Sequence, residues 1–147
     1  MKRIYSLLLC ILNVLVFIAC GQEEDSDKTI YPVFYISNAG TKVEMHEHVM
    51  QAISEEEQLQ ELVDCLSTVP DKLEYKAPLS MGFQVLSVSV DDGKVLLDVD
   101  AAYNKLPATT EVLVRAAIVR TLTQLPSVNY VGITVEGMQL YDVMLMQ

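Results

Sequence analysis

Cysteine, glycine and tryptophan are scarce or absent in this chain of 147 residues. It has three cysteines, six glycines and no tryptophan. Cys10 lies inside an apolar N-terminal run and Cys20 directly after it, so Cys65 is the only cysteine in the rest of the chain. A single thiol can form neither a disulfide within a domain nor a thiolate metal cluster. We therefore interpret Cys65, on the flank of a predicted helix, as a small buried apolar side chain.

The familiar motifs of catalysis are also missing. The sequence contains no G-x-S-x-G, H-E-x-x-H or C-x-x-C pattern, and its few glycines leave little material for a phosphate-binding loop. Asp98 and Asp100 share one face of a predicted strand, but this face lies opposite the apolar alternation, where a solvated surface belongs. The sequence therefore predicts a protein that is not an enzyme and has no cofactor.

The two histidines form the cluster that comes nearest to a metal site. On a strand, His46 and His48 would share a face, and imidazole is a common metal ligand. Two histidines without a third ligand nearby make a weak site, however, and a solvated strand edge explains them equally well. We predict no metal, and keep His46 and His48 as weak candidates.

Basic residues are outnumbered two to one, with 10 Lys and Arg against 20 Asp and Glu. Residues 1–19 contain two of the basic residues and no acid, so the chain from Cys20 onward has 8 basic and 20 acidic residues, a formal charge of −12. Such a surface repels phosphate backbones. Nucleic acid is therefore not an expected partner.

The most specific pattern in the sequence is its N-terminus. Lys2 and Arg3 precede an almost wholly apolar run over residues 4–18, which ends at Ala19-Cys20 and is followed by an acidic stretch. A run of about 15 apolar residues is typical of a signal peptide and short for a membrane span, which needs about 20. The small residue before a cysteine resembles the lipobox of bacterial lipoproteins.

This resemblance implies removal of residues 1–19 and attachment of lipid to Cys20, which would become the new N-terminus. Residues 20–29 would then form an acidic tether and residues 30–147 a domain on the outer face of the bacterial cytoplasmic membrane. The membrane would be a partner through the lipid on Cys20. The alternative is an uncleaved anchor helix, which would leave the domain facing outward as well.

Strand patterns are clear in five places and open in one. Residues 30–36 are rich in β-branched and aromatic side chains, whereas residues 42–49 fit either a strand or a loop. Residues 85–90 and 95–101 are joined through Asp92-Gly93, a strong hairpin signal. The remaining predicted strands are residues 128–135 and 138–143.

Two helices are predicted. The first starts at a capping box formed by Ser54 and Glu57 and ends at Pro70. Its apolar residues are spaced for one buried stripe, namely Leu59, Leu62, Val63 and Leu66. The second is capped by Thr109 or Thr110, runs to about Leu125 and is closed by Pro126.

The second helix carries two apolar strips. Its core strip consists of Val114, Ile118, Leu122 and Leu125. The other strip, Val112, Ala116 and Val119, lies well round the helix and is either buried against the sheet or an interface; we favour the interface slightly. Arg115 and Arg120, the only cations of the helix, belong to the same candidate surface.

The expected architecture is a single small α+β domain. Its elements follow the order β-α-β-β-α-β-β, with both helices on one face of the sheet.

The last third of the chain resembles the GerMN domain family. Thr121-Leu122-Thr123 leads through Pro126 into Val128-Asn129-Tyr130-Val131-Gly132-Ile133-Thr134-Val135-Glu136-Gly137, which is similar to the closing pattern of that family. Residues 33–35, 59–66, 78–88 and 93–103 are similar to its earlier elements, so that the resemblance spans about residues 31–143.

The resemblance implies a fold similar to ring-building motifs and a protein without enzymatic activity. It also implies an envelope protein linked to sporulation or germination, which works through protein partners or self-association. The alternative function is the binding of a small ligand or a cell-wall glycan. Against it, the predicted loops are poor in the aromatic residues that stack on sugars.

Overall fold

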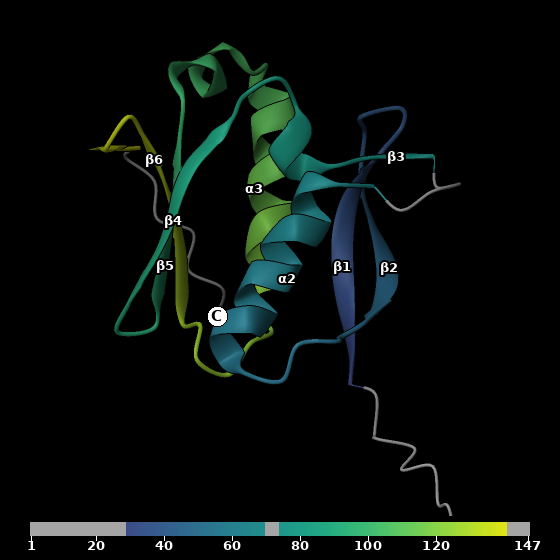
Figure 1. Ribbon diagram of the computed structural model, residues 1–147. Coiled ribbons are helices and arrows are strands. Elements are labelled where there is room, and N and C mark those ends of the chain that lie inside the picture. The colour runs from purple at the N-terminus through teal and green to yellow at the C-terminus, as the bar shows by residue number, and fades with distance from the viewer. Residues whose placement is uncertain (1–28, 70–73, 141–147) are drawn as a thin grey trace, which may run out of the picture.

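The computed structural model describes residues 29–69 and 74–140 (Figure 1). Nine regular helices and strands are present among these residues: β1 (Ile30–Ser37), β2 (Val43–Val49), α2 (Glu55–Ser67), β3 (Tyr75–Lys76), β4 (Val85–Asp91), β5 (Lys94–Val99), α3 (Ala108–Leu122), β6 (Tyr130–Val135) and β7 (Met138–Gln139). Two short 3-10 helices, η1 (Pro78–Ser80) and η2 (Ala101–Lys105), complete the described part.

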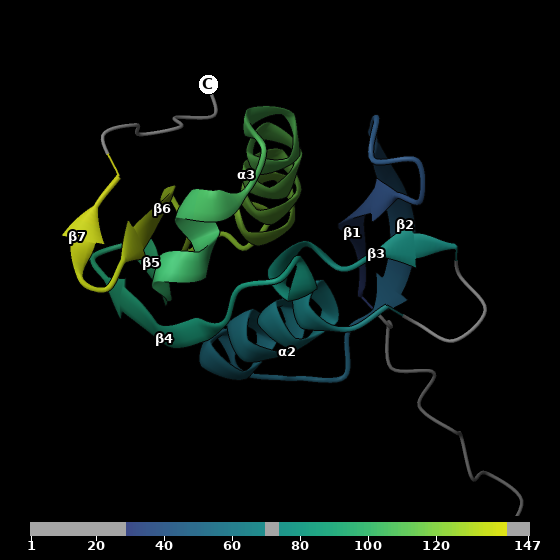
Figure 2. The same cartoon turned by 90° about the horizontal axis from the view of Figure 1, so that it is seen from above.

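The strands form two sheets, and both helices lie between them (Figures 1 and 2). One sheet has the order β2-β1-β3 and the other the order β4-β5-β6-β7. The α+β class is confirmed, but the expected arrangement of helices on one face of a single sheet is replaced by this layered one. The physical reason is that β1 pairs with its neighbour in sequence, β2, and its other edge faces α3, so it cannot join β4–β7.

The segment that the sequence left open is a strand. β2 runs antiparallel to β1 in unbroken register, from Ile30 opposite Val49 to Ile36 opposite Val43. The predicted hairpin between β4 and β5 is also present. Its turn residues Asp92 and Gly93 have φ values of 46° and 76°, the left-handed conformations that a two-residue hairpin turn requires.

Helix α3 makes the crossover between two parallel strands. β5 and β6 pair in parallel, with Val95 opposite Val131 and Val99 opposite Val135. Parallel neighbours require a long connection, usually a helix packed on the sheet. α3 therefore covers the face of β4–β7 that carries Val95, Leu97 and Val99, all of which are buried.

Helix α2 has the expected start and the expected buried stripe. The Ser54 hydroxyl accepts the Glu57 amide, and the Glu57 carboxylate accepts the Ser54 amide in return. The four residues of the predicted stripe, Leu59, Leu62, Val63 and Leu66, are all buried. The helix ends at Ser67, and Pro70 lies outside the described residues.

Helix α3 is displaced from its predicted limits. It begins at Ala108, and no side chain caps it, so the prediction of a cap at Thr109 or Thr110 is wrong. Pro107 occupies the cap position with φ −57°, and its carbonyl accepts the amide of Glu111. Because the proline ring holds φ near its helical value, the helix can start at Ala108, directly before the two threonines, without a side-chain cap. It ends at Leu122 rather than Leu125, although Leu125 is buried.

The edge of β1 that β2 leaves free is closed by side chains of α3 and the turn after it. β3 pairs only with Ile36 and Ser37, at the end of β1. Further along this strand the amide of Phe34 donates to Thr121 Oγ1 at 3.0 Å, and Gln124 Nε2 donates to the carbonyl of Pro32 at 2.6 Å. Unpaired backbone groups at a covered strand edge would be costly, and these two side chains satisfy them.

Replacing Thr121 with Val should test the importance of this closure. The change keeps the shape of the side chain but removes the acceptor of the Phe34 amide in a buried position, so the free energy of unfolding should fall by about 1–3 kcal/mol. Thr109→Val, on the exposed first turn of the same helix, serves as the control. Urea denaturation followed by circular dichroism measures both; equal stability of the two variants would contradict the prediction.

Candidate functional site

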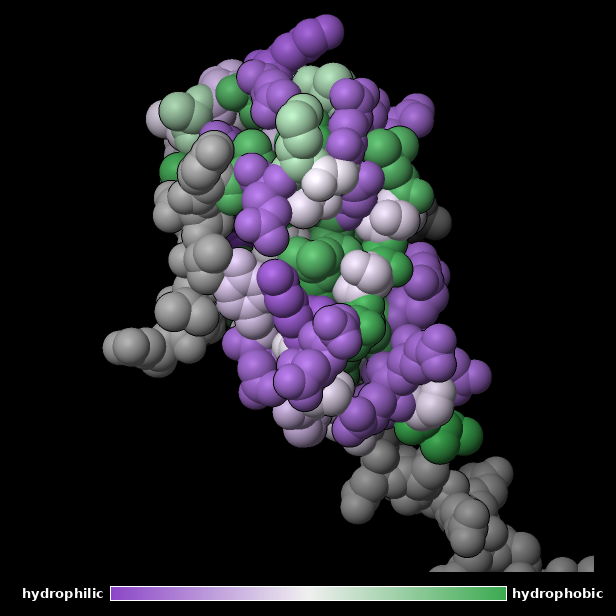
Figure 3. Space-filling view, turned by 90° about the vertical axis from the view of Figure 1, so that its left-hand side faces the viewer, coloured by the Kyte–Doolittle hydropathy of each residue, from purple (hydrophilic) through white to green (hydrophobic). Residues whose placement is uncertain are grey.

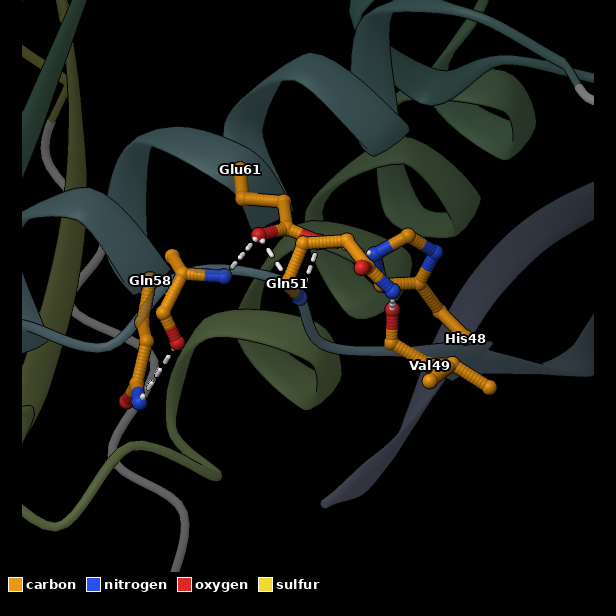
Figure 4. Close-up of polar contacts among 6 residues, drawn as sticks. His48, Val49, Gln51, Gln58 and Glu61 are labelled. Atoms are coloured by element: carbon orange, nitrogen blue, oxygen red, sulfur yellow. Dashed lines mark hydrogen bonds and ion pairs between the residues drawn. The ribbon is translucent and has the colours of Figure 1, made fainter. Parts of the chain in front are cut away.

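Glu61 is the centre of the best-connected polar cluster in the described part of the chain (Figure 4). Its carboxylate lies 2.5 Å from His48 Nε2 and accepts the amides of Gln51 and Ala52. Nearby, Gln58 Nε2 donates to the carbonyl of Ala52. The cluster therefore joins β2, the loop that follows it and the middle of α2.

The environment of Glu61 keeps it ionised. Desolvation tends to raise the pKa of its carboxyl group, but the hydrogen bonds from His48, Gln51 and Ala52 together outweigh it and hold the pKa below the ordinary value. Its acceptor positions are occupied by structural donors. We therefore infer that this carboxylate stabilises the connection between β2 and α2 and does not act as a catalytic base.

The two metal candidates of the sequence are used differently. His46 and His48 share a face of β2, as predicted, but His48 binds Glu61 and His46 lies beside the ring of Tyr35, with 6.5 Å between ring centroids. Within residues 29–69 and 74–140 there is no group of three or more side chains arranged to hold a metal ion.

The carboxylate pair formed by Asp98 on β5 and Asp100 just after it also has structural partners. Asp98 accepts the Thr134 hydroxyl at 2.7 Å and the amide of Gly137 at 2.8 Å. These two hydrogen bonds hold the pKa of Asp98 below its ordinary value, and the bond from Gly137 contributes most. Asp100 accepts the amide of Gln84. Asp98 thus fixes the turn between β6 and β7, and Asp100 the segment that enters β4.

Cys65 is half-buried on α2 and packs against the core. Burial, with smaller contributions from the carboxylates of Glu61 and Asp64, raises the pKa of its thiol to about 11. At neutral pH this thiol is protonated, which fits the interpretation of Cys65 as a small apolar side chain.

The three residues of the candidate interface strip on α3 differ in how exposed they are. Val112 is 56% exposed and Ala116 half-buried, but Val119 is only 6% exposed and belongs to the core. Including Val119 in an interface was therefore wrong. Because α3 lies between two sheets, it is buried over a wider arc than a helix on one face of a sheet, and this arc reaches Val119.

The two arginines of α3 have intramolecular contacts. Arg115 is largely buried, and its guanidinium lies 3.4 Å from Glu111, one turn earlier. The Arg120 guanidinium lies 4.0 Å from the centre of the Phe34 ring, a cation–π contact that partly covers the outer face of β1.

Two pairs of apolar residues lie on the outer face of the β2-β1-β3 sheet and are wholly or partly exposed. Ile30 lies opposite Val49, and Phe34 lies opposite Met45. Ile30 and Met45 are each more than half exposed. Glu47 lies between the two pairs, opposite Pro32, so that the apolar surface is interrupted by a charge.

A groove of about 800 Å³ lies between the start of α2 and β4. Val88 and Val90, on its β4 side, lie opposite Leu97 and Val95 and thus point to the inner face of their sheet. Yet Val90 is 54% exposed, because no described element covers it. The residues that line the groove are Glu55, Glu56, Glu57, Leu59, Gln60, Val88, Val90, Ser127 and Val128.

The groove combines an apolar floor with a negative rim. Leu59 and Val128 are buried beneath it, whereas Glu55, Glu56 and Glu57 are exposed at its edge. Hydrogen bonds from Ser54 hold the pKa of Glu57 below its ordinary value, so this carboxylate stays charged. Figure 3 shows the side that carries β4–β7, where hydrophobic and hydrophilic side chains are interspersed on the surface.

The sequence predicted the two elements that form the groove, the start of α2 and the strand β4. It did not predict that they lie next to each other. The sequence predicted a strand over residues 85–90 and a helix that starts at the Ser54–Glu57 capping box, and both are present. Neither pattern says that the helix start and the strand would lie side by side with the space between them open.

The N-terminal prediction falls on residues that the structure does not describe, since residues 1–28, with Cys20, lie outside it. Within the described ranges, no helix combines the length and apolar character needed to cross a membrane.

Comparison with known proteins places the domain in context. Residues 32–141 match the Germane family, described as "Sporulation and spore germination". Among curated proteins, none matches this chain significantly. The structure is similar to the first GerMN domain of the sporulation protein GerM from Bacillus subtilis, with a TM-score of 0.57 and 15% identity over 81% of this chain and 94% of that one.

The tandem GerMN domains of the same Bacillus subtilis protein match with equal TM-score and identity, 0.57 and 15%, over 82% of this chain and 45% of that one. This chain therefore corresponds to one domain of the tandem pair. At this identity the likeness establishes the fold.

Replacing Glu61 with Gln should weaken the acid sensitivity of the fold. A carboxyl group whose pKa is lower in the folded state stabilises it fully above the ordinary value of 4.5, and this contribution is lost as the pH falls through the folded pKa. Glu61→Gln should be less stable than the wild type at pH 7, by about 1–3 kcal/mol, and should lose less stability on acidification. Urea denaturation over a pH series measures both. Glu47→Gln, which removes an exposed carboxylate from β2, is the control, and a parallel pH dependence of Glu61→Gln and wild type would refute the prediction.

Proposed function

Because this chain belongs to the Germane family of sporulation and spore germination domains, we propose that it is an envelope lipoprotein whose single domain docks onto another protein. The observation that supports docking most directly is the open groove between α2 and β4. Its floor consists of side chains of the kind that normally lie in a core, and exposed apolar surface of this sort marks interaction sites.

Membrane attachment is the second part of the proposal. It is supported by the charged start, the apolar run and the small residue before Cys20. Lipid on this cysteine would hold the domain at the outer face of the bacterial cytoplasmic membrane. The stretch from Gly21 to Thr29 would serve as the tether, since β1 begins at Ile30.

The absence of enzymatic activity is part of the same proposal. The polar clusters most similar to catalytic groups have structural partners: Glu61 holds the loop after β2, and Asp98 holds the turn after β6. A glycan site is less well supported, because the groove lining contains no aromatic side chain on which a sugar could stack.

On α3, Val112 is the part of the predicted strip that is open to a partner, and Ala116 lies one turn further along. We retain these two residues as a second docking surface. Arg115 and Arg120 border it, and their contacts with Glu111 and Phe34 hold them in place.

Replacing Cys20 with Ala tests the anchor. The lipid-bearing thiol is lost, so the protein should leave the membrane fraction or accumulate as an uncleaved precursor. Cell fractionation and intact mass spectrometry measure this, with Cys65→Ala as the control that removes a thiol without touching the anchor. Wild-type mass and membrane retention in Cys20→Ala would refute lipidation.

Photo-crosslinking tests docking in the native envelope. A photoreactive amino acid at Val90 should crosslink to a second protein, whereas one at Ser89, its exposed neighbour on the outer face of β4, should not. A third position, Val112, reports on α3. If none of these positions captures a protein in envelopes at any growth stage, the docking proposal fails.

A further inference from the structure

We propose that the groove between α2 and β4 receives a segment of a partner protein that places an apolar side chain on the valines and lysine or arginine side chains at the glutamate rim. This inference rests on the proposed docking function and gives the chemistry of the partner.

The floor of the groove requires an apolar occupant. Val90 is directly opposite Val95, which is fully buried, and yet more than half of Val90 remains in contact with solvent. Val88, two residues earlier on the same face, is half-buried. An aliphatic or aromatic side chain seated here would remove the exposed apolar surface of these valines from water, which favours binding.

The rim requires a cationic occupant. Three consecutive carboxylates, Glu55, Glu56 and Glu57, line the groove, and no lysine or arginine is among its lining residues. Asp91 and Asp92, at the tip of the hairpin that carries Val90, add negative charge next in sequence, and Lys94, opposite Asp91, offsets one of these charges. The rim would repel an apolar segment that also carries acidic residues. A segment without charged residues would gain no electrostatic attraction from the rim.

The charge of this chain argues against its own segments as occupants. Residues 21–27 contain four acids and no base, and residues 141–147 contain Asp142 and no base. A second copy is disfavoured for the same reason, since the chain from Cys20 onward has 20 acidic and 8 basic residues. The charge complement is therefore a different, basic protein segment.

Three short fluorescent peptides of equal length test this chemistry on the purified full-length protein. One combines leucine with lysine, the second replaces each leucine with serine, and the third replaces each lysine with glutamate. Fluorescence anisotropy should show that only the leucine–lysine peptide binds well. Its affinity should fall as salt is added, because salt screens the rim charges.

Two double variants separate the groove from general negative charge. Glu55→Gln with Glu56→Gln neutralises the rim but preserves the capping box of Ser54 and Glu57, and should weaken binding about tenfold, a change of 1.4 kcal/mol. Glu47→Gln with Glu74→Gln removes the same charge from exposed positions elsewhere and should leave affinity within about twofold. Equal loss in both, or equal binding of the serine–lysine peptide, would overturn the proposal.

The same rim variant, placed in the crosslinking experiment, distinguishes this inference from the proposed function. Loss of the Val90 crosslink in Glu55→Gln with Glu56→Gln, with retention in the control pair, supports a basic partner. A Val90 crosslink that survives rim neutralisation overturns the charge inference while docking at the groove stands. Crosslinks from Val112 alone overturn the groove as the site, and no crosslink from either position overturns the docking function itself.

Discussion

The position of α3 between two sheets is the constraint on which the rest of the structure depends. One side of the helix covers the parallel strands β5 and β6, and its other side closes the edge of β1 through Thr121, with Gln124 just beyond the helix. A helix in this position must bury side chains over most of its circumference. This explains why Val119 is buried, and why few positions of α3, such as Val112, remain available to a partner.

Helix α2 has a different place in the same arrangement. It is tied to the end of β2 by Glu61, and its single apolar stripe packs into the core. Its first turn, however, is turned toward the edge strand β4 without filling the space beside Val90. Glu57 of this helix therefore has two roles: it belongs to the capping box that starts the helix, and it also lies on the groove rim.

Local patterns in the sequence predicted the local structure well. The Ser54–Glu57 capping box and the Asp92–Gly93 turn each depend on a few neighbouring residues, and both are present. What the sequence could not show is which surfaces meet. The closure of β1 joins residues separated by 87 positions, and the helical period of α3 cannot tell one covering sheet from two. The same limit applies to the groove, whose lining comes from two elements and from the turn before β6. For the N-terminus, the sequence pattern alone supports the anchor.

The direct continuation of the tether into β1 has a mechanical consequence. Any tension between a membrane anchor and the domain would enter at Ile30 and run along the axis of β1. The hydrogen bonds between antiparallel strands lie perpendicular to that axis, so those that join β1 to β2 would bear the load together in shear rather than open one after another. The Thr121 and Gln124 bonds on the opposite edge would share it. With the proposed lipid on Cys20, the strand that receives such a pull would be held by hydrogen bonds along both of its edges.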